Sequence, residues 1–175
     1  MYQLGATGPR VKRSPLAPGA AGTLQTLHVM RELVREGSKD VNVREAALKA
    51  VRHVAPRDYV GEVRALFGAV QRGIRFTRDP VDVETLQAPR YTLAIGAGDC
   101  DDMTTLLAAM IRSVGHGVKL AARAIGTNPA TPAVFRHVYL VADVDGRRIA
   151  LDPSHHATPF GWEFPSPTRA LELAL

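Results

Sequence analysis

Cysteine is nearly absent from this sequence, which has one such residue among 175. A single cysteine excludes an internal disulfide and leaves a free thiol, which is typical of a reducing compartment or an inert buried position. No run of about 18 apolar residues occurs, so we expect no membrane-spanning helix and no membrane partner. The first 22 residues lack the apolar stretch of a secretory signal, so we predict no signal peptide.

Aromatic residues are also scarce, at 6% of the chain, and the net charge is only +5. Residues 1–22 are rich in proline, glycine and alanine and show no periodicity, which predicts a flexible arm. Part of the positive charge lies in this arm, at Arg10, Lys12 and Arg13. Nucleic-acid binding is disfavoured because no basic and aromatic surface pattern or known motif accompanies the charge. It stays an alternative that rests on the arm alone.

Apolar residues recur at spacings of three and four in the first half of the chain. This pattern predicts helices over 23–37, with Thr23 as N-cap, over 42–54 and over 58–72. The segment after residue 73 carries prolines and no sustained period, which predicts a long ordered loop before residue 99. The last ten residues predict a short helix.

We therefore predict one catalytic domain of the α+β class after the arm. Its expected parts are a helical region at 23–73, a core at 74–156 and a tail at 157–175.

The single cysteine, Cys100, lies at the start of the most strongly patterned helix. Apolar residues repeat at helical spacing from Met103 to Val114, and Cys100 shares their face. Asp99 suits the N-cap, which places Cys100 at the first helical position. Free N–H groups there favour an anion and can hold an oxyanion, and Gly98 permits close approach of a substrate. The alternative is that Cys100 is a small buried apolar residue.

A hairpin downstream brings a histidine and an aspartate together. Two strand-like runs flank an Asp-Gly pair at 145–146, which indicates a two-residue turn that pairs Leu140 with Leu151. Because side chains alternate, His137 and Asp152 then lie on one face as diagonal neighbours, about 7–8 Å apart at the backbone. One hydrogen bond can join their side chains. The alternative is an ordinary strand histidine beside an exposed carboxylate.

No cluster of cysteine and histidine accompanies these residues. The adjacent His155 and His156 have poor geometry for one metal ion, so we predict no metal site and no cofactor.

The order of these residues is recognisable: a cysteine at a helix start, a histidine on a strand and an aspartate at the end of the next strand. With "GAGDCDDMTTLLAAMIRSVGHGVKLAA" and "FRHVYLVADVDGRRIALDPS", the chain resembles the transglutaminase-like superfamily of papain-fold enzymes. Within it, the sequence is similar to bacterial and bacteriophage proteins with a GDCDD core. The upstream "IRFTRDPVDVETLQAPRYTL" resembles the segment before the cysteine in those phage proteins. The resemblance covers roughly 58–154.

The resemblance implies a nucleophile at Cys100, a general base at His137 and an orienting acid at Asp152, with the Cys helix packed on an antiparallel sheet. It also implies an upstream oxyanion donor, for which Gln87 and Tyr91 are candidates. Further candidates for substrate or oxyanion binding are the neighbours of the three residues, namely Gly98, Asp99, Tyr139 and His155.

The expected function is cysteine-dependent hydrolysis or acyl transfer at a peptide or isopeptide amide of a protein substrate. The resemblance implies a phage or prophage protein, in the host cytoplasm or on the virion. The alternative is an inactive structural or assembly protein of a phage particle that keeps the fold and contacts other phage structural proteins.

Overall fold

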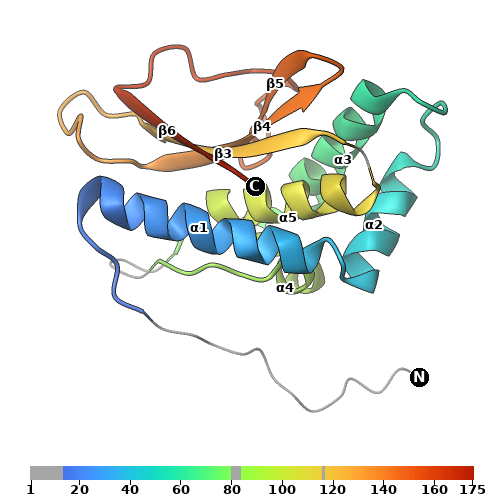
Figure 1. Cartoon of the computed structure of the whole chain (residues 1–175), viewed down its shortest axis with the longest axis horizontal. Helices are drawn as coiled ribbons and strands as arrows, with labels where there is room; N and C mark the ends of the chain where they lie inside the picture. Colours follow the sequence, from blue (N-terminus) through green and yellow to red (C-terminus); the bar gives the residue numbers. More distant parts are fainter. Residues whose placement is uncertain (1–13, 80–83, 116) are drawn as a thin grey trace.

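The computed structural model describes residues 14–79, 84–115 and 117–175. Its elements are α1 (Gly19–Gly37), α2 (Val41–Val51), α3 (Tyr59–Gly73), β1 (Arg75–Phe76), α4 (Pro89–Ile95), β2 (Ala97–Gly98), α5 (Cys100–Ser113), β3 (Lys119–Gly126), β4 (His137–Val144), β5 (Arg147–Leu151) and β6 (Arg169–Ala174). Four strands form an antiparallel sheet in the order β5-β4-β3-β6. In Figure 1, α1, α2, α4 and α5 lie below this sheet, and α3 lies beside it. This is the predicted α+β class, with the Cys helix packed against a small sheet.

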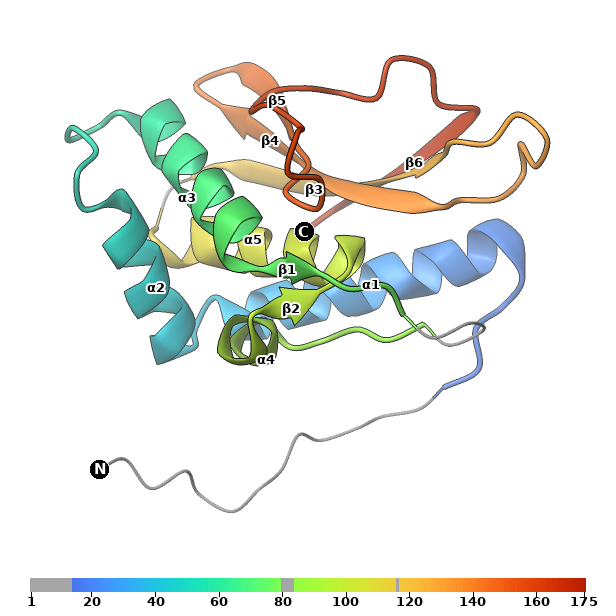
Figure 2. The ribbon, with the colours of Figure 1, turned by 180° about the vertical axis from the view of Figure 1, so that it is seen from behind.

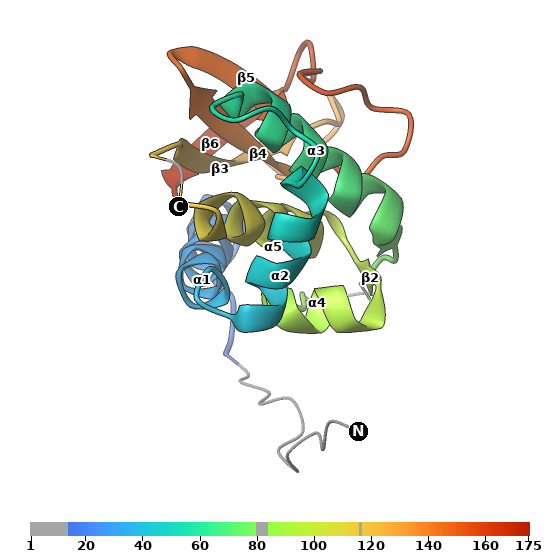
Figure 3. The same ribbon diagram turned by 90° about the vertical axis from the view of Figure 1, so that its right-hand side faces the viewer.

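Helix α5 is the centre of the structure. Twelve of its fourteen residues are buried, polar ones such as Asp101, Asp102 and Thr104 among them, because other elements surround the helix. Strand β4 packs on one side of it, and α1, α2, α3 and α4 pack around the others (Figure 3). The position of Cys100 at the start of α5 is therefore fixed by the whole core.

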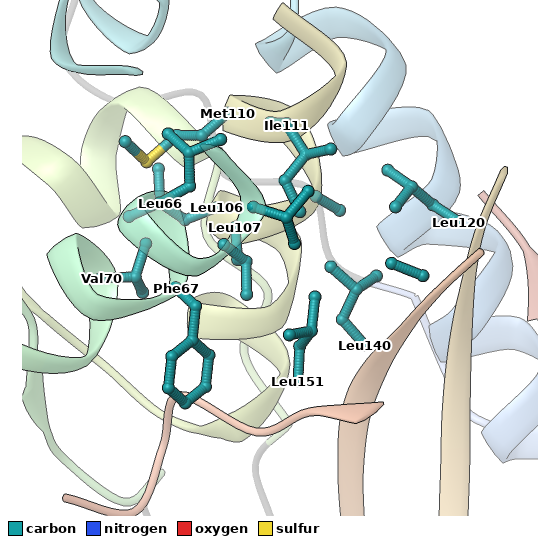
Figure 4. Packing of buried hydrophobic residues seen from close by; sticks show 14 of the residues in the cluster. Leu66, Phe67, Val70, Leu106, Leu107, Met110, Ile111, Leu120, Leu140 and Leu151 are labelled. Atoms are coloured by element: carbon teal, nitrogen blue, oxygen red, sulfur yellow. The ribbon is translucent and has the colours of Figure 1, made fainter. Parts of the chain in front are cut away.

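The main core lies where α3 and α5 meet the sheet. Figure 4 shows side chains of these elements interleaved, among them Leu66, Phe67, Leu107, Leu140 and Leu151. The apolar face predicted for the hairpin is the face that covers α5. The predicted register is confirmed, because Leu140 pairs with Leu151. Asp145 and Gly146 both have positive φ, at 52° and 73°, as a two-residue turn of this type requires.

The first helix begins earlier than predicted. Its N-cap is Pro18, and α1 starts at Gly19, so Thr23 lies inside the helix and the predicted N-cap is wrong. A local contact accounts for this early start. The Ala17 N–H donates to Gln25 Oε1 at 2.8 Å and holds the chain before α1 against the first turns of the helix. The predicted arm is therefore wrong at residues 19–22.

The basic residues of the arm, Arg10, Lys12 and Arg13, lie outside the described residues. The second helix begins at Val41 and not at Asn42, because the side chain of Asp40 accepts the N–H groups of residues 42 and 43.

The predicted loop before residue 99 contains a helix. Pro89 occupies the first turn of α4, where a missing N–H costs nothing, and Gly96 ends the helix with φ 64°. Strands β1 and β2 then pair in parallel, as Figure 2 shows from behind. The short β1–β2 ladder ties the end of α3 to the residues just before Cys100.

The predicted C-terminal helix is wrong, because residues 169–174 form strand β6 on the edge of β3. Burial alternates along β6, with Leu171 and Leu173 partly buried against the second core cluster. Helix-forming residues adopt a strand here because pairing with β3 outweighs their intrinsic preference. The segment predicted as a tail thus completes the sheet. Within the described residues, every helix is too short or too polar to cross a membrane.

Substitution Leu107→Ala should lower the free energy of unfolding by about 2–5 kcal/mol, because Leu107 is fully buried in the main core. Urea denaturation followed by circular dichroism measures the change. The matched control is Leu48→Ala on α2, where the side chain is 46% exposed and the loss should stay near 0.5 kcal/mol, about the scale of a surface substitution. Equal losses in the two variants would contradict the described core.

Candidate active site

The N-terminus of α5 is capped as predicted. Asp99 Oδ1 accepts the N–H groups of Asp101 and Asp102, at 3.2 and 3.3 Å. The Asp102 side chain in turn accepts the Asp99 N–H at 3.4 Å, which completes a capping box. Cys100 is therefore the first helical residue, where a backbone N–H has no acceptor within the helix.

Gly98 serves close packing at this helix start. A Cβ there would lie 2.7 Å from the Asp102 Cβ and 3.2 Å from Thr92 Cγ2, so a larger residue would force the backbone apart. Gly98 is buried and does not line the cavity beside Cys100. The structure thus gives this candidate a packing role that fixes where Cys100 lies.

His137 and Asp152 meet as the hairpin register predicts. His137 Nε2 lies 2.7 Å from Asp152 Oδ2. The other carboxylate oxygen of Asp152 accepts the N–H and the hydroxyl of Ser154, at 3.1 and 2.6 Å. Asp152 is thereby fixed on both sides, and it holds the orientation of the imidazole.

The charges of the pair reinforce one another. Burial lowers the pKa of His137, but hydrogen bonds to Asp152 and Cys100 outweigh it and raise the pKa to about 10. Burial raises the pKa of Asp152, but its hydrogen bond with His137 and the charge of that imidazole bring the pKa below its usual value. At neutral pH the imidazole is charged and faces both the thiol and the carboxylate.

A cavity of about 460 Å³ opens beside these residues and is lined by Cys100 and His137. The N-terminal half of α1 forms one wall, and residues 134–138 form another. The cavity is also lined by the acidic residues Glu84, Asp99 and Asp101. Sulfur and imidazole therefore share one space that can admit a substrate.

The aspartates around Cys100 carry raised pKa values. Burial is the main cause for Asp101, whose pKa lies well above its usual value, followed by its hydrogen bond to Asp99 and by nearby negative charge. Burial also raises the pKa of Asp102 to about 7, although the Gln87 N–H, which donates to it at 2.7 Å, opposes the shift. The raised pKa of Asp101 favours its neutral form, which lessens the crowding of negative charge beside the thiol.

These three aspartates are also the described side chains that come nearest to a metal site. Carboxylate oxygens of Asp99, Asp101 and Asp102 lie within 4.8 Å of one another. Two of the three already accept backbone N–H groups in the capping box. The prediction that the protein uses no metal stays a prediction.

The two oxyanion candidates on the upstream segment lie away from the cavity. Gln87 Oε1 accepts from the Thr92 hydroxyl at 3.4 Å, so the side chain is turned toward α4. Tyr91 is 41% exposed on α4 and does not line the cavity. The backbone of Gln87 does reach the first turn of α5, through its bond to Asp102. This segment supports the helix start through its main chain.

The candidates beside the histidine also differ in place. The Tyr139 ring lies 6.1 Å from the His137 ring, and its hydroxyl donates to Glu163 Oε1 at 3.1 Å. Burial is the main cause that raises the pKa of Tyr139 to about 12. The phenol of Tyr139 is therefore neutral beside the imidazole. His155 is exposed and contributes its backbone carbonyl, which accepts from Gln71 at 2.9 Å.

Sequence reasoning missed the wall made by α1 and the carboxyl group of Glu84. The wall includes Gly22, Thr23 and Thr26, whose polar or small character gives no signal in a single sequence. Glu84 lies in the long segment between Pro80 and Pro89, and the length of that segment was the available signal.

The sequence model of the transglutaminase-like superfamily matches residues 46–153, which include Cys100, His137 and Asp152. The match covers more than half of the chain, and the fold agrees with it. The chain belongs to the transglutaminase-like superfamily. No curated protein matches the chain.

Two solved structures share the fold. A candidate protease from Parabacteroides distasonis is 16% identical with a TM-score of 0.58, over 82% of this chain and 27% of that chain. A candidate cysteine protease from Cytophaga hutchinsonii is 13% identical with a TM-score of 0.53, over 91% of this chain and 59% of that chain. The chain thus spans about a quarter of the first protein and three fifths of the second, and the likeness concerns the fold.

Substitution Asp152→Asn should lower the pKa of His137 from about 10 toward its ordinary value of 6.5, because the carboxylate charge is lost. NMR titration of the imidazole measures this shift. The native pKa lies above the ordinary one, so the stability that this charge contributes is complete below pH 6.5 and is lost as pH rises through about 10. In Asp143→Asn, an exposed position on the same strand, the titration of His137 should not change. An unshifted pKa in Asp152→Asn would contradict the described pair.

Proposed function

We propose that this protein is a cysteine-dependent enzyme that hydrolyses or transfers the acyl group of a peptide or isopeptide amide. The observation that carries the proposal is that Cys100 and His137 line one cavity while Asp152 holds the imidazole. Membership of the superfamily and the fold of two candidate proteases support it.

The proposed reaction starts from a thiolate at Cys100 and a charged His137. The sulfur attacks the carbonyl carbon, and a carbon–sulfur bond forms as the carbonyl oxygen becomes an oxyanion. The carbon–nitrogen bond then breaks, and His137 gives its proton to the leaving amine. Because Nε2 is held by Asp152, Nδ1 is the ring nitrogen that exchanges this proton.

The second half of the reaction releases the enzyme. Neutral His137 takes a proton from water or from a second amine, which attacks the thioester. The carbon–sulfur bond breaks, the acid or the new amide leaves, and the thiolate and the imidazolium are restored. Asp152 stabilises the imidazolium throughout and does not itself take the proton.

The oxyanion is held at the start of α5. Asp99 occupies the N–H groups of residues 101 and 102, and the N–H of Cys100 lies where no helical acceptor exists. A partial positive charge at this helix end adds to its pull on an anion. We propose the Cys100 N–H as one oxyanion donor, since Gln87 and Tyr91 lie outside the cavity.

The proposed phage origin and location of the protein rest on the resemblance alone. The GDCDD core and the segment before it favour a phage or prophage protein, with a protein substrate in the host cytoplasm or on the virion. An inactive assembly protein with the same fold is the competing outcome, and reactivity at Cys100 separates the two. Rapid alkylation by iodoacetamide near neutral pH supports the enzyme, and a thiol that reacts only after denaturation supports the scaffold.

Substitutions Cys100→Ala and His137→Ala should each lower kcat/KM by at least about a thousandfold, because they remove the nucleophile and the proton carrier. The assay uses a panel of fluorogenic peptide amides and glutamine peptides, with and without a primary amine as acceptor. Tyr91→Phe, on exposed α4, is the control and should retain activity. Equal turnover by the wild type and both alanine variants would reject the mechanism.

The pH dependence of kcat/KM should follow His137. Acylation needs the charged imidazole as proton donor, so the rate should fall as pH rises through about 10 in the wild type. In Asp152→Asn this fall should move to lower pH because the carboxylate no longer stabilises the charge. Stopped-flow rates from pH 5 to 11 measure the profile, and a fall at the same pH in both proteins would exclude His137 as the donor.

A further inference from the structure

The cavity beside Cys100 has walls of two different kinds. One part is apolar: the buried side chains of Leu27, Met30, Ala124 and Val138 line it, and Leu16 and Val134 lie at its exposed edge. The cavity is also lined by three acidic residues, Glu84, Asp99 and Asp101. Few ligand groups suit both parts at once, and a long apolar stem with a positively charged end is one that does.

Among the described residues, no salt bridge joins a lysine or arginine to the carboxyl groups of Glu84, Asp99 or Asp101. Asp101 is 3% exposed, and its Oδ1 has no hydrogen-bond partner among the described residues. A buried polar atom left without a partner is costly, and such atoms are rare in folded proteins. Burial, the first cause in both cases, raises the pKa of Asp101 and of Glu84, as expected for partly enclosed carboxyl groups without a nearby cation among the described residues.

Among the described residues that line the cavity, Arg136 is the one cationic side chain besides His137, and its guanidinium is engaged with another residue. Arg136 lines the cavity from the side of residues 134–138, but its guanidinium donates to the Thr131 hydroxyl at 3.3 Å. Among the described side chains, Arg136 forms no ion pair with Glu84, Asp99 or Asp101. His137 is held by Asp152. The acidic side of the cavity is therefore open to a charge brought by a ligand.

We propose that this cavity selects a substrate residue with a cationic group on an apolar stem, of the lysine or arginine kind, next to the amide that Cys100 attacks. The stem lies along Leu27, Met30 and Val138, and the ammonium or guanidinium group lies among Glu84, Asp99 and Asp101. This inference rests on the proposed function for the identity of the attacked bond, but the preference for positive charge is a property of the cavity.

The preference can be measured without any substrate. Three methanethiosulfonate reagents carry an aminoethyl, a methyl or a sulfonatoethyl group, and each forms a disulfide with Cys100 and releases methanesulfinate. Their rates with Cys100 are divided by their rates with a small free thiol. We expect the cationic reagent to be favoured over the anionic one by about tenfold or more, as carboxylates concentrate cations in a cleft.

Variants locate the source of the preference. Glu84→Gln should reduce the ratio of cationic to anionic rates several-fold, and Asp101→Asn serves as a second, isosteric variant should the first fail to fold by circular dichroism. Glu45→Gln, on the exposed side of α2, is the matched control and should leave the ratio unchanged. An equal rate ratio for the three reagents, or no change in either variant, would overturn the proposal.

A peptide panel separates this proposal from the proposed function. Peptides carry lysine or norleucine on either side of the scissile amide, and kcat/KM should be at least about tenfold higher with lysine at one of the two places. Hydrolysis with no preference for lysine over norleucine would overturn the proposed cation site but would support the proposed enzymatic activity. A preference of Cys100 for the cationic thiol reagent, without hydrolysis of any peptide, would support the cation site and overturn the proposed enzymatic activity. Micromolar binding of Ca²⁺ that Glu84→Gln abolishes, seen by calorimetry, would assign the carboxylates to a metal and overturn the proposal.

Discussion

The capping of α5 by Asp99 is the constraint on which the site depends. It sets the first turn of a helix whose other residues are almost all buried, and it leaves Cys100 at the one end that faces a cavity. Asp102 completes the cap and also holds the main chain of Gln87, so the cap and the upstream segment form one unit. The negative charge of this cap lies next to a thiol, and burial raises the pKa of the neighbouring Asp101, which favours the neutral form of that carboxyl group. His137, charged and held by Asp152, supplies the balancing positive charge.

The parts of the site that local rules govern were predictable from the sequence. An Asp-Gly turn fixes a hairpin register, and that register alone brings His137 to Asp152. An aspartate before an apolar helical period predicts a cap, and the cap places Cys100. Both outcomes rest on backbone geometry over a few residues. There the preference of Asp-Gly for a tight turn, or of aspartate for an N-cap, determines the local structure.

Other parts depend on contacts between distant segments. The residues of β6 favour a helix by themselves, but the free edge of β3 takes them as a strand. The start of α1 at Gly19 is held by the contact of the Ala17 N–H with Gln25, and α1 lies against the cavity because it packs on α5. No spacing in the sequence reveals either contact. Gln87 was a reasonable oxyanion candidate by resemblance, yet its amide is turned to Thr92. The walls of the cavity were therefore beyond sequence reasoning, whereas the positions of Cys100 at the helix start and of His137 beside Asp152 were not.

The superfamily match begins at residue 46, whereas α1, which forms one wall of the cavity, ends at Gly37. The residues proposed for the reaction and part of the cavity wall thus belong to separate stretches of polypeptide. A change in α1 can reshape which partners fit while the hairpin and the capped helix stay intact. Changing the residues of this helix that face the cavity, such as Thr23 and Thr26, while keeping its buried core residues is accordingly a route to new selectivity.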